Sequence, residues 1–95
     1  MTITEPQIYG FIEDYDEWVF DQGELRGVYE FENFLEALAF VNDSAEIIEQ
    51  RGHAPAILIE DYKVTLTFWK RGEMMIGEQD LEMIKDFTDL LEGTY

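Results

Sequence analysis

The fold is decided by residues 33–68, which read NFLEALAFVNDSAEIIEQRGHAPAILIEDYKVTLTF. In the first half of this stretch, apolar side chains recur every three or four positions, which is the period of an amphipathic helix. Asn33, with Glu36 three residues later, is a helix-start signal, and Gly52 is a typical helix-stop residue. The pattern therefore predicts one long helix between Asn33 and Gly52.

The second half of the stretch predicts a β-hairpin. Beyond Pro55, Ile57 and Ile59 lead to a turn at Glu60-Asp61. After the turn, the apolar residues Val64, Leu66 and Phe68 alternate with Thr65, Thr67 and Trp69, with a period of two. This alternation is typical of a strand with one buried face, so neighbouring residues should point to opposite sides of the sheet.

A second hairpin is expected before the long helix. The segment Asp21-Gln22-Gly23 is flanked by Trp18-Val19-Phe20 and by the stretch from Leu25 through Phe31. It is a glycine-containing connection whose length favours a bulged turn. Further upstream, Thr4-Glu5-Pro6-Gln7 has capping-box spacing and predicts a short first helix that runs to about Tyr15.

The C-terminal part predicts a last helix. After a loop at 71–73, Gly77 and Asp80 suit a helix start, and one stripe carries the apolar residues Leu81, Ile84, Phe87 and Leu91. The order along the chain is therefore α-ββ-α-ββ-α. We expect one domain over residues 1–95, of the α+β class, with a two-layer architecture: a four-stranded antiparallel sheet with the helices packed on one face. The reason is that each helix has a single apolar stripe to bury.

Composition narrows the range of partners. The 95 residues include 22 acidic and 6 basic side chains, for a formal net charge of -16, which repels phosphate backbones and anionic lipid headgroups. We therefore expect no nucleic acid and no membrane as partners. The charge is read either as a soluble, self-repelling surface, with adaptation to salt as one cause, or as a docking surface for a basic partner.

Cysteine usage and the N-terminal sequence bear on localisation. The chain has no cysteine, which excludes disulfides and thiolate sites and fits a reducing compartment. Residues 1–6 show neither a basic nor an apolar signal segment, and no apolar run approaches the roughly 18 residues of a membrane helix. The expected localisation is cytoplasmic.

The sequence contains a single histidine, His53, just past the long helix. No metal-ligand spacing surrounds it, and the scattered glycines form no phosphate-binding loop, so neither a metal site nor a nucleotide site is expected. Glu49, four residues earlier, is positioned either to orient the imidazole as a tuned acid or base, or to form a solvated pair at the helix end.

Several motifs together resemble the pterin-4a-carbinolamine dehydratase family. The signal is Glu-x-x-x-His-x-Pro after an alanine-rich helix, followed by two strands and a late aspartate. The matching residues are Trp18, Tyr29-Glu30-Phe31, Phe34, residues 36–42, Glu49, His53, Pro55, residues 63–66 and Asp80. The resemblance covers nearly the whole chain and implies the fold more firmly than the activity, because many of these positions are core positions.

The family removes water from a 4a-hydroxytetrahydropterin without a metal or another cofactor, and its pattern supplies three histidines for the proton transfers. This chain resembles the pattern at His53 but has Ala54 at the second histidine position and Arg71 near the third. Alanine transfers no protons, and an arginine that stays charged is a poor proton shuttle. The resemblance implies His53 and Glu49 as catalytic residues and the following ligand-binding residues: Ala54, Pro55, Lys70, Arg71 and Asp80.

The function therefore has more than one reading. The first is a dehydratase with weak or lost activity that still binds a pterin. The second is a non-catalytic protein-interaction or assembly module, and the third is a purely structural domain. The resemblance also implies a homo-oligomer, a dimer or a tetramer. Lys70 and Arg71 are either pterin-binding or ordinary basic loop residues, and Trp69 is either a stacking platform for a ring or part of sheet packing or a subunit interface.

Overall fold

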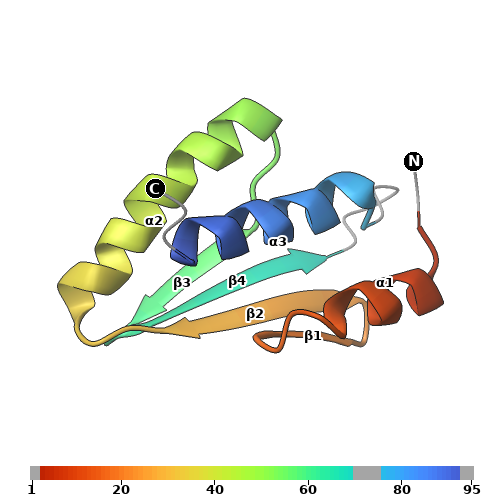
Figure 1. Cartoon of the computed structure of the whole chain (residues 1–95), viewed down its shortest axis with the longest axis horizontal. Coiled ribbons are helices and arrows are strands. Elements are labelled where there is room, and N and C mark those ends of the chain that lie inside the picture. The colour runs from red at the N-terminus through yellow and green to blue at the C-terminus, as the bar shows by residue number, and fades with distance from the viewer. Residues whose placement is uncertain (1–2, 70–75, 93–95) are drawn as a thin grey trace.

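The computed structural model describes residues 3–69 and 76–92 of the chain. Helices and strands follow one another in the predicted order (Figure 1). They are α1 (Glu5–Ile12), β1 (Trp18–Asp21), β2 (Glu24–Glu30), α2 (Phe34–Arg51), β3 (Ala56–Glu60), β4 (Lys63–Trp69) and α3 (Glu78–Leu91). The prediction of an α-ββ-α-ββ-α chain is confirmed.

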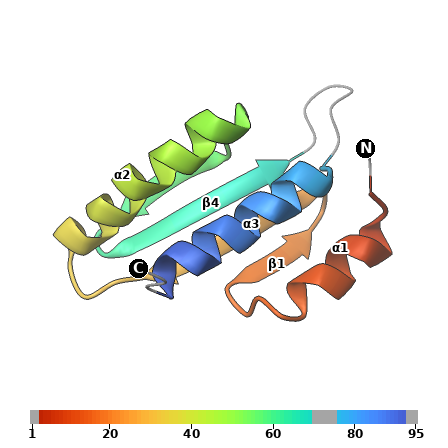
Figure 2. The same ribbon diagram turned by 45° about the horizontal axis from the view of Figure 1, so that its top comes forward.

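The four strands form one antiparallel sheet in the order β1-β2-β4-β3. The two hairpins therefore meet along β2 and β4, whose pairing runs from Glu24↔Trp69 to Glu30↔Lys63. Helices α2 and α3 lie side by side over one face of this sheet, and α1 lies next to β1 at the sheet edge (Figures 1 and 2). The predicted two-layer α+β architecture is confirmed.

The first hairpin turn is tighter than predicted. Asp21 pairs with Glu24, which leaves only Gln22 and Gly23 in the turn, with φ values of 51° and 81°. Positive φ at both central residues is the geometry of a type I′ turn, which matches the twist of the flanking strands. The expected bulge is therefore wrong, because a two-residue turn already joins the strands in register.

The second hairpin turn is shifted by one residue from its prediction. Glu60 pairs with Lys63, so the turn consists of Asp61 and Tyr62, and Asp61 has a φ of 54°. Aspartate is one of the few residues besides glycine that tolerates this conformation.

The helix-end signals have the structural roles that the sequence indicates. Thr4 and Gln7 form a reciprocal capping box, and the Asn33 side chain accepts a hydrogen bond from the Glu36 N–H at 2.9 Å. Helix α1 ends at Ile12 instead of Tyr15. The chain continues there as tight turns with bonds between residues three apart, such as Tyr15 N–H to Ile12 O at 2.9 Å.

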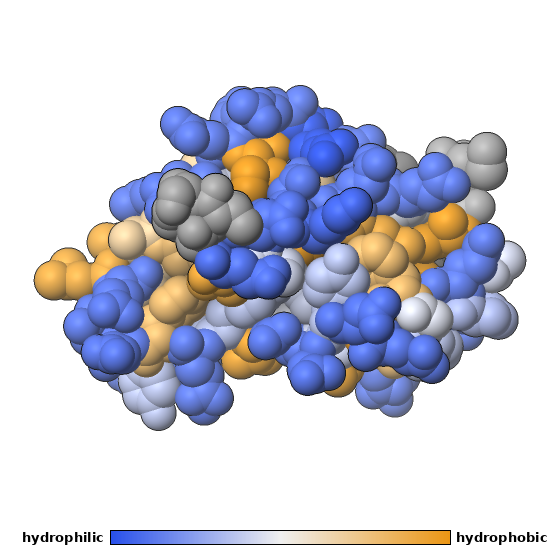
Figure 3. All heavy atoms as spheres, viewed as in Figure 1, coloured by the Kyte–Doolittle hydropathy of each residue, from blue (hydrophilic) through white to orange (hydrophobic). Residues whose placement is uncertain are grey.

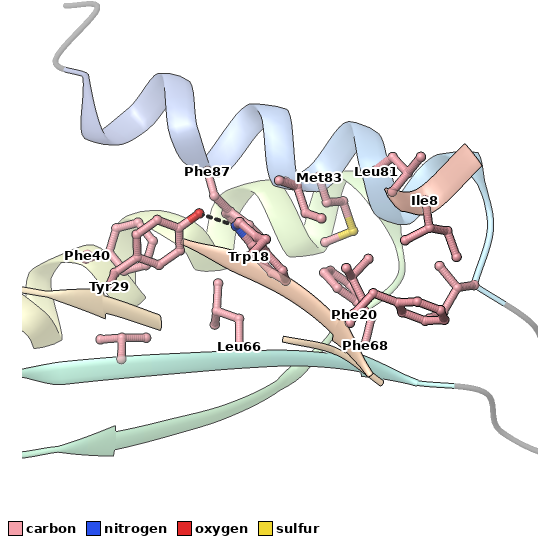
Figure 4. Close-up of a cluster of buried hydrophobic side chains, with 14 of the residues drawn as sticks. Ile8, Trp18, Phe20, Tyr29, Phe40, Leu66, Phe68, Leu81, Met83 and Phe87 are labelled. Carbon is pink, nitrogen blue, oxygen red and sulfur yellow. Dashed lines mark hydrogen bonds between the residues drawn. The ribbon is translucent and has the colours of Figure 1, made fainter. Parts of the chain in front are cut away.

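The core lies between the sheet and helices α2 and α3, and Ile8 of α1 contributes to it (Figure 4). Its centre includes the completely buried residues Leu25, Leu66, Met83, Ile84 and Phe87. Leu91 is an exception to the predicted stripe on α3, because its side chain is 39% exposed at the end of the helix.

Trp18 lies flat against its cross-strand partner Gly27. A Cβ atom at residue 27 would overlap the ring carbons of Trp18, so the absence of a side chain makes room for the indole. The Trp18 indole N–H donates a hydrogen bond to the Tyr29 hydroxyl at 2.6 Å (Figure 4). This bond satisfies the polar edge of a ring that is only 3% exposed.

The surface is mostly hydrophilic where the helices face solvent, with apolar side chains between and below them (Figure 3). Within residues 3–69 and 76–92, no helix combines the length and the apolar character needed to cross a membrane.

Candidate active site

His53 lies immediately after the end of α2. Gly52 ends the helix in the left-handed conformation, with φ 69°, and its N–H donates to the Ile48 carbonyl at 2.9 Å. The chain then turns toward the first turn of α3, where His53 Nε2 lies 2.7 Å from Asp80 Oδ1. A helix end and a helix start thus meet at one imidazole–carboxylate pair.

The sheet supports the imidazole from below. The rings of His53 and Phe68 stack at a centroid distance of 5.8 Å with an angle of 17° between their planes. Phe68 is 2% exposed and stacks in turn on Trp18 at 5.9 Å. The orientation of His53 is therefore fixed by the packed core as well as by Asp80.

Asp80 is a buried carboxylate, with its side chain 7% exposed. Its second oxygen, Oδ2, accepts a hydrogen bond from the Gly77 N–H at 3.1 Å, as a residue in the first turn of a helix can do. Burial raises the pKa of Asp80, while the Gly77 N–H and His53 act in the opposite direction. A titratable group with a pKa displaced by burial and facing a histidine is a typical feature of functional sites.

Glu49 does not contact His53 in the way that its spacing suggests. Glu49 is exposed on α2, and the structure records no hydrogen bond or ion pair between Glu49 and His53. The reason is that Gly52 stops the helix before residue 53, so the two residues are not one helical turn apart. The carboxylate that contacts the imidazole is that of Asp80.

The other predicted ligand-binding residues have different surroundings. Ala54 is exposed next to His53, and Pro55 is buried. Lys70 and Arg71 lie outside the described residues. Trp69 is 37% exposed and follows Phe68 on β4, so alternation places it on the other face of the sheet from the imidazole. A stacking platform on Trp69 would therefore not be beside His53.

The partnership between His53 and Asp80 was missed by sequence reasoning. Both residues stand out in the sequence, but spacing alone places Glu49 near His53, and it indicates Asp80 only as a helix-start and ligand-binding residue. The available signal was the position of Asp80 three residues after Gly77, which places its carboxylate at the helix start. Nothing local in the sequence indicates that the helix start lies against residue 53.

This arrangement is suited to proton transfer. A carboxylate that holds one imidazole nitrogen fixes the ring and stabilises its protonated form, which is the role of the acidic member in many acid–base pairs. The His53 side chain is 30% exposed, so a ligand can reach the ring. Among the described residues, no three histidine or carboxylate side chains are close enough to share a metal ion.

Comparison with known proteins identifies the family. The family model for pterin 4 alpha carbinolamine dehydratase matches residues 1–90. A protein from Marinobacter nauticus named "Putative pterin-4-alpha-carbinolamine dehydratase" is 38% identical over 71 residues, which is 70% of this chain and 64% of that protein. A protein of the same name from Vibrio vulnificus is 50% identical over 57 residues, which is 60% of this chain and 52% of that protein. The matched segment thus spans between about half and two thirds of each relative.

A solved structure shows the same fold. The transcriptional coactivator/pterin dehydratase from Brucella melitensis superposes with a TM-score of 0.84, over 95% of this chain and 98% of that one. The sequence identity is 20%, so this likeness supports the fold alone. With the family match over residues 1–90, these findings show that the chain belongs to the pterin 4 alpha carbinolamine dehydratase family.

Proposed function

We propose that this protein binds a 4a-hydroxytetrahydropterin and catalyses its dehydration slowly, with His53 as the acid–base group and Asp80 as the residue that holds it. The observation that carries the proposal is the contact between the only imidazole of the chain and a buried carboxylate. Membership of the family supports the substrate class, and the 30% exposure of the His53 side chain supports access by a ligand.

The chemistry explains why turnover should be slow. In the elimination, the C4a–O bond breaks, a ring N–H proton is removed, and the hydroxyl leaves as water after it gains a proton. One imidazole can take the ring proton and then give it to the hydroxyl, so the atoms and charges balance with a single group. Each missing acid or base group commonly costs about 10²- to 10⁴-fold in rate. The side chain of Ala54 has no acid or base group.

The test is a stopped-flow assay with freshly prepared 4a-hydroxytetrahydropterin. It compares the natural chain with His53→Ala and with Ala54→His, which adds an imidazole next to the existing one. We expect a rate slightly above that of buffer for the natural chain, the buffer rate for His53→Ala, and a rate at least about tenfold higher for Ala54→His.

The outcomes separate slow catalysis from none. If His53→Ala is as fast as the natural chain and both exceed buffer, His53 is not the acid–base group. If the natural chain equals buffer while Ala54→His exceeds it, the scaffold binds pterin but the natural protein is not an enzyme.

A second function is supported by exposed apolar side chains at the start of α2. Phe34 is 51% exposed and Leu35 is 74% exposed, although both are large and apolar. Such residues favour contact with another protein surface. The alternative proposal is therefore a non-catalytic interaction or assembly module. The partner in this case is a second copy of the chain, in a dimer or a tetramer. The proposed location is the cytoplasm. Sedimentation of the natural chain and of Leu35→Glu tests it, because loss of an oligomer only in the variant would place the interface at α2.

A further inference from the structure

The end of α2 is bound to α3 by a single arginine. Arg51 donates to Asp86 Oδ2 from Nε at 3.1 Å and from Nη2 at 2.8 Å, and to Glu82 Oε2 from Nη1 at 3.2 Å. The Gln79 side-chain amide donates in the reverse direction, to the Arg51 backbone carbonyl, at 2.6 Å. We call these four residues the α2–α3 clamp: Arg51, Gln79, Glu82 and Asp86.

The spacing along α3 explains how the clamp works. Gln79, Glu82 and Asp86 are separated by three and four residues, so they form one stripe that faces the end of α2. The bond from Gln79 also satisfies one of the carbonyls that the last turn of a helix leaves without an intrahelical partner. A basic side chain in this last turn is favourable for the helix dipole as well.

The clamp residues are close in sequence to both members of the His53–Asp80 contact. Arg51 precedes His53 by two residues, and Gln79 is the direct neighbour of Asp80. The two halves of the pair belong to different segments, which are connected along the chain only through β3, β4 and the residues before α3. Their separation therefore depends on how the end of α2 lies against the start of α3.

We propose that Arg51 and Gln79 are positioning residues that hold His53 and Asp80 at proton-transfer geometry. The inference rests on the proposed function for its effect on turnover, but its geometric content can be tested without any activity. Catalytic groups need their positions fixed to a fraction of an ångström, and a shift of about 1 Å can cost about 10²-fold in rate.

If the clamp only stabilised the fold, its removal would lower the melting temperature and leave the imidazole unchanged. The Arg51 side chain is 33% exposed and that of Asp86 is 31% exposed, and partly exposed ion pairs contribute little to stability. Removing the clamp should therefore change the melting temperature only slightly. The state of the imidazole should change clearly.

The geometric test uses the single histidine as its own probe. Long-range ¹H–¹⁵N spectra of the ¹⁵N-labelled protein give one pair of ring nitrogen signals, since the sequence holds one imidazole. The spectra are recorded at a pH high enough for the ring to be neutral. The proteins compared are the natural chain, Arg51→Met and Gln79→Met. The control is Arg26→Met, which removes the same charge from an ion pair with Glu24 on the sheet.

We expect Arg51→Met and Gln79→Met to move the Nε2 and Nδ1 signals toward each other, as the hydrogen bond to Asp80 stops favouring one tautomer. Arg26→Met should leave both signals in place. Unchanged ring signals in both clamp variants would overturn the proposal. If Arg51→Met does not fold, Gln79→Met decides the question, because it alters no charge.

The kinetic test follows only if the natural chain dehydrates the pterin. Arg51→Met should lower kcat about tenfold, with KM changed less than about twofold. An unchanged kcat, or a rise in KM alone, would show that Arg51 does not act through His53. Absence of activity in the natural chain would refute the proposed function, and the spectra would still decide the clamp.

Discussion

His53 Nε2 lies 2.7 Å from Asp80 Oδ1, although a complete β-hairpin separates the two residues along the chain. The contact joins the end of α2 to the start of α3, directly above Phe68 of the sheet. A mobile imidazole in a solvated loop would be a poor acid–base group, whereas this ring is held on one side by a carboxylate and on its face by an aromatic ring.

Replacing Asp80 with asparagine should change how stability depends on pH. Burial raises the pKa of Asp80 in the folded protein, so the folded state holds this proton more tightly than the unfolded chain does. Ionisation of Asp80 therefore destabilises the natural protein as the pH rises from near the ordinary value of 3.8 through the folded pKa. The cost is absent at lower pH and present in full above this range.

Asp80→Asn cannot ionise, so its free energy of unfolding relative to the natural chain should increase with pH over that range. Urea unfolding at a series of pH values measures the difference. The same substitution in a His53→Ala background separates the contribution of the histidine. A difference that stays constant or decreases with pH would contradict the burial effect.

Phe68→Leu should weaken both the core and the site. Phe68 stacks on Trp18 and on His53, and a stacked aromatic pair contributes about 0.5 to 1.5 kcal/mol beyond the area it buries. We expect a loss of about 1 to 3 kcal/mol in the free energy of unfolding, together with a slower dehydration rate. The matched control is Phe11→Leu, whose ring stacks on Tyr15 in the α1 region. The control should lose stability without losing rate, and a rate loss in both would argue against a specific role for the Phe68 face.

Tyr29→Phe should leave a buried donor without an acceptor. The Trp18 indole N–H donates to the Tyr29 hydroxyl at 2.6 Å, and both residues are buried. A buried polar group that loses its partner costs about 1 to 3 kcal/mol. Tyr62→Phe removes a hydroxyl from a residue that is 43% exposed, and it should change stability by less than about 0.5 kcal/mol. Similar urea midpoints for the two variants would show that the buried bond contributes nothing.

Two glycines should respond to alanine in opposite directions. A Cβ at Gly27 would overlap the Trp18 ring, so Gly27→Ala should destabilise by about 1 to 3 kcal/mol or more. No atom lies within 4 Å of the corresponding position at Gly10, which is in α1. Gly10→Ala should therefore stabilise by about 0.5 to 1 kcal/mol, because alanine favours the helix. Thermal melts of both variants check this, and a stabilised Gly27→Ala would refute the close approach of the ring.

Much of the fold could be predicted because its signals are local. The caps at Thr4, Asn33 and Gly52, and the alternation along β4, are properties of a few consecutive residues. The errors occurred where local signals leave a choice. The length of α1, the type of the Gln22-Gly23 turn and the shift of the second turn each depend on how neighbouring segments pair.

The site could be predicted only in part. His53 was evident as the single imidazole, and Asp80 was evident as a residue at a helix start. Their pairing, and the lack of a recorded contact between Glu49 and His53, follow from the direction in which the chain leaves α2 at Gly52. The spacing of residues along the sequence does not predict that direction.

The sequence by itself determined the order of the helices and strands, the buried face of β4 and the presence of a single imidazole, because each of these depends on the periodicity or identity of residues close together in the chain. Only the tertiary structure decided which carboxylate holds His53, that Phe68 lies beneath it, and that Arg51 binds the end of α2 to α3. These contacts join segments far apart in the chain, and they form when burial of the apolar faces brings α2 and α3 together over the sheet.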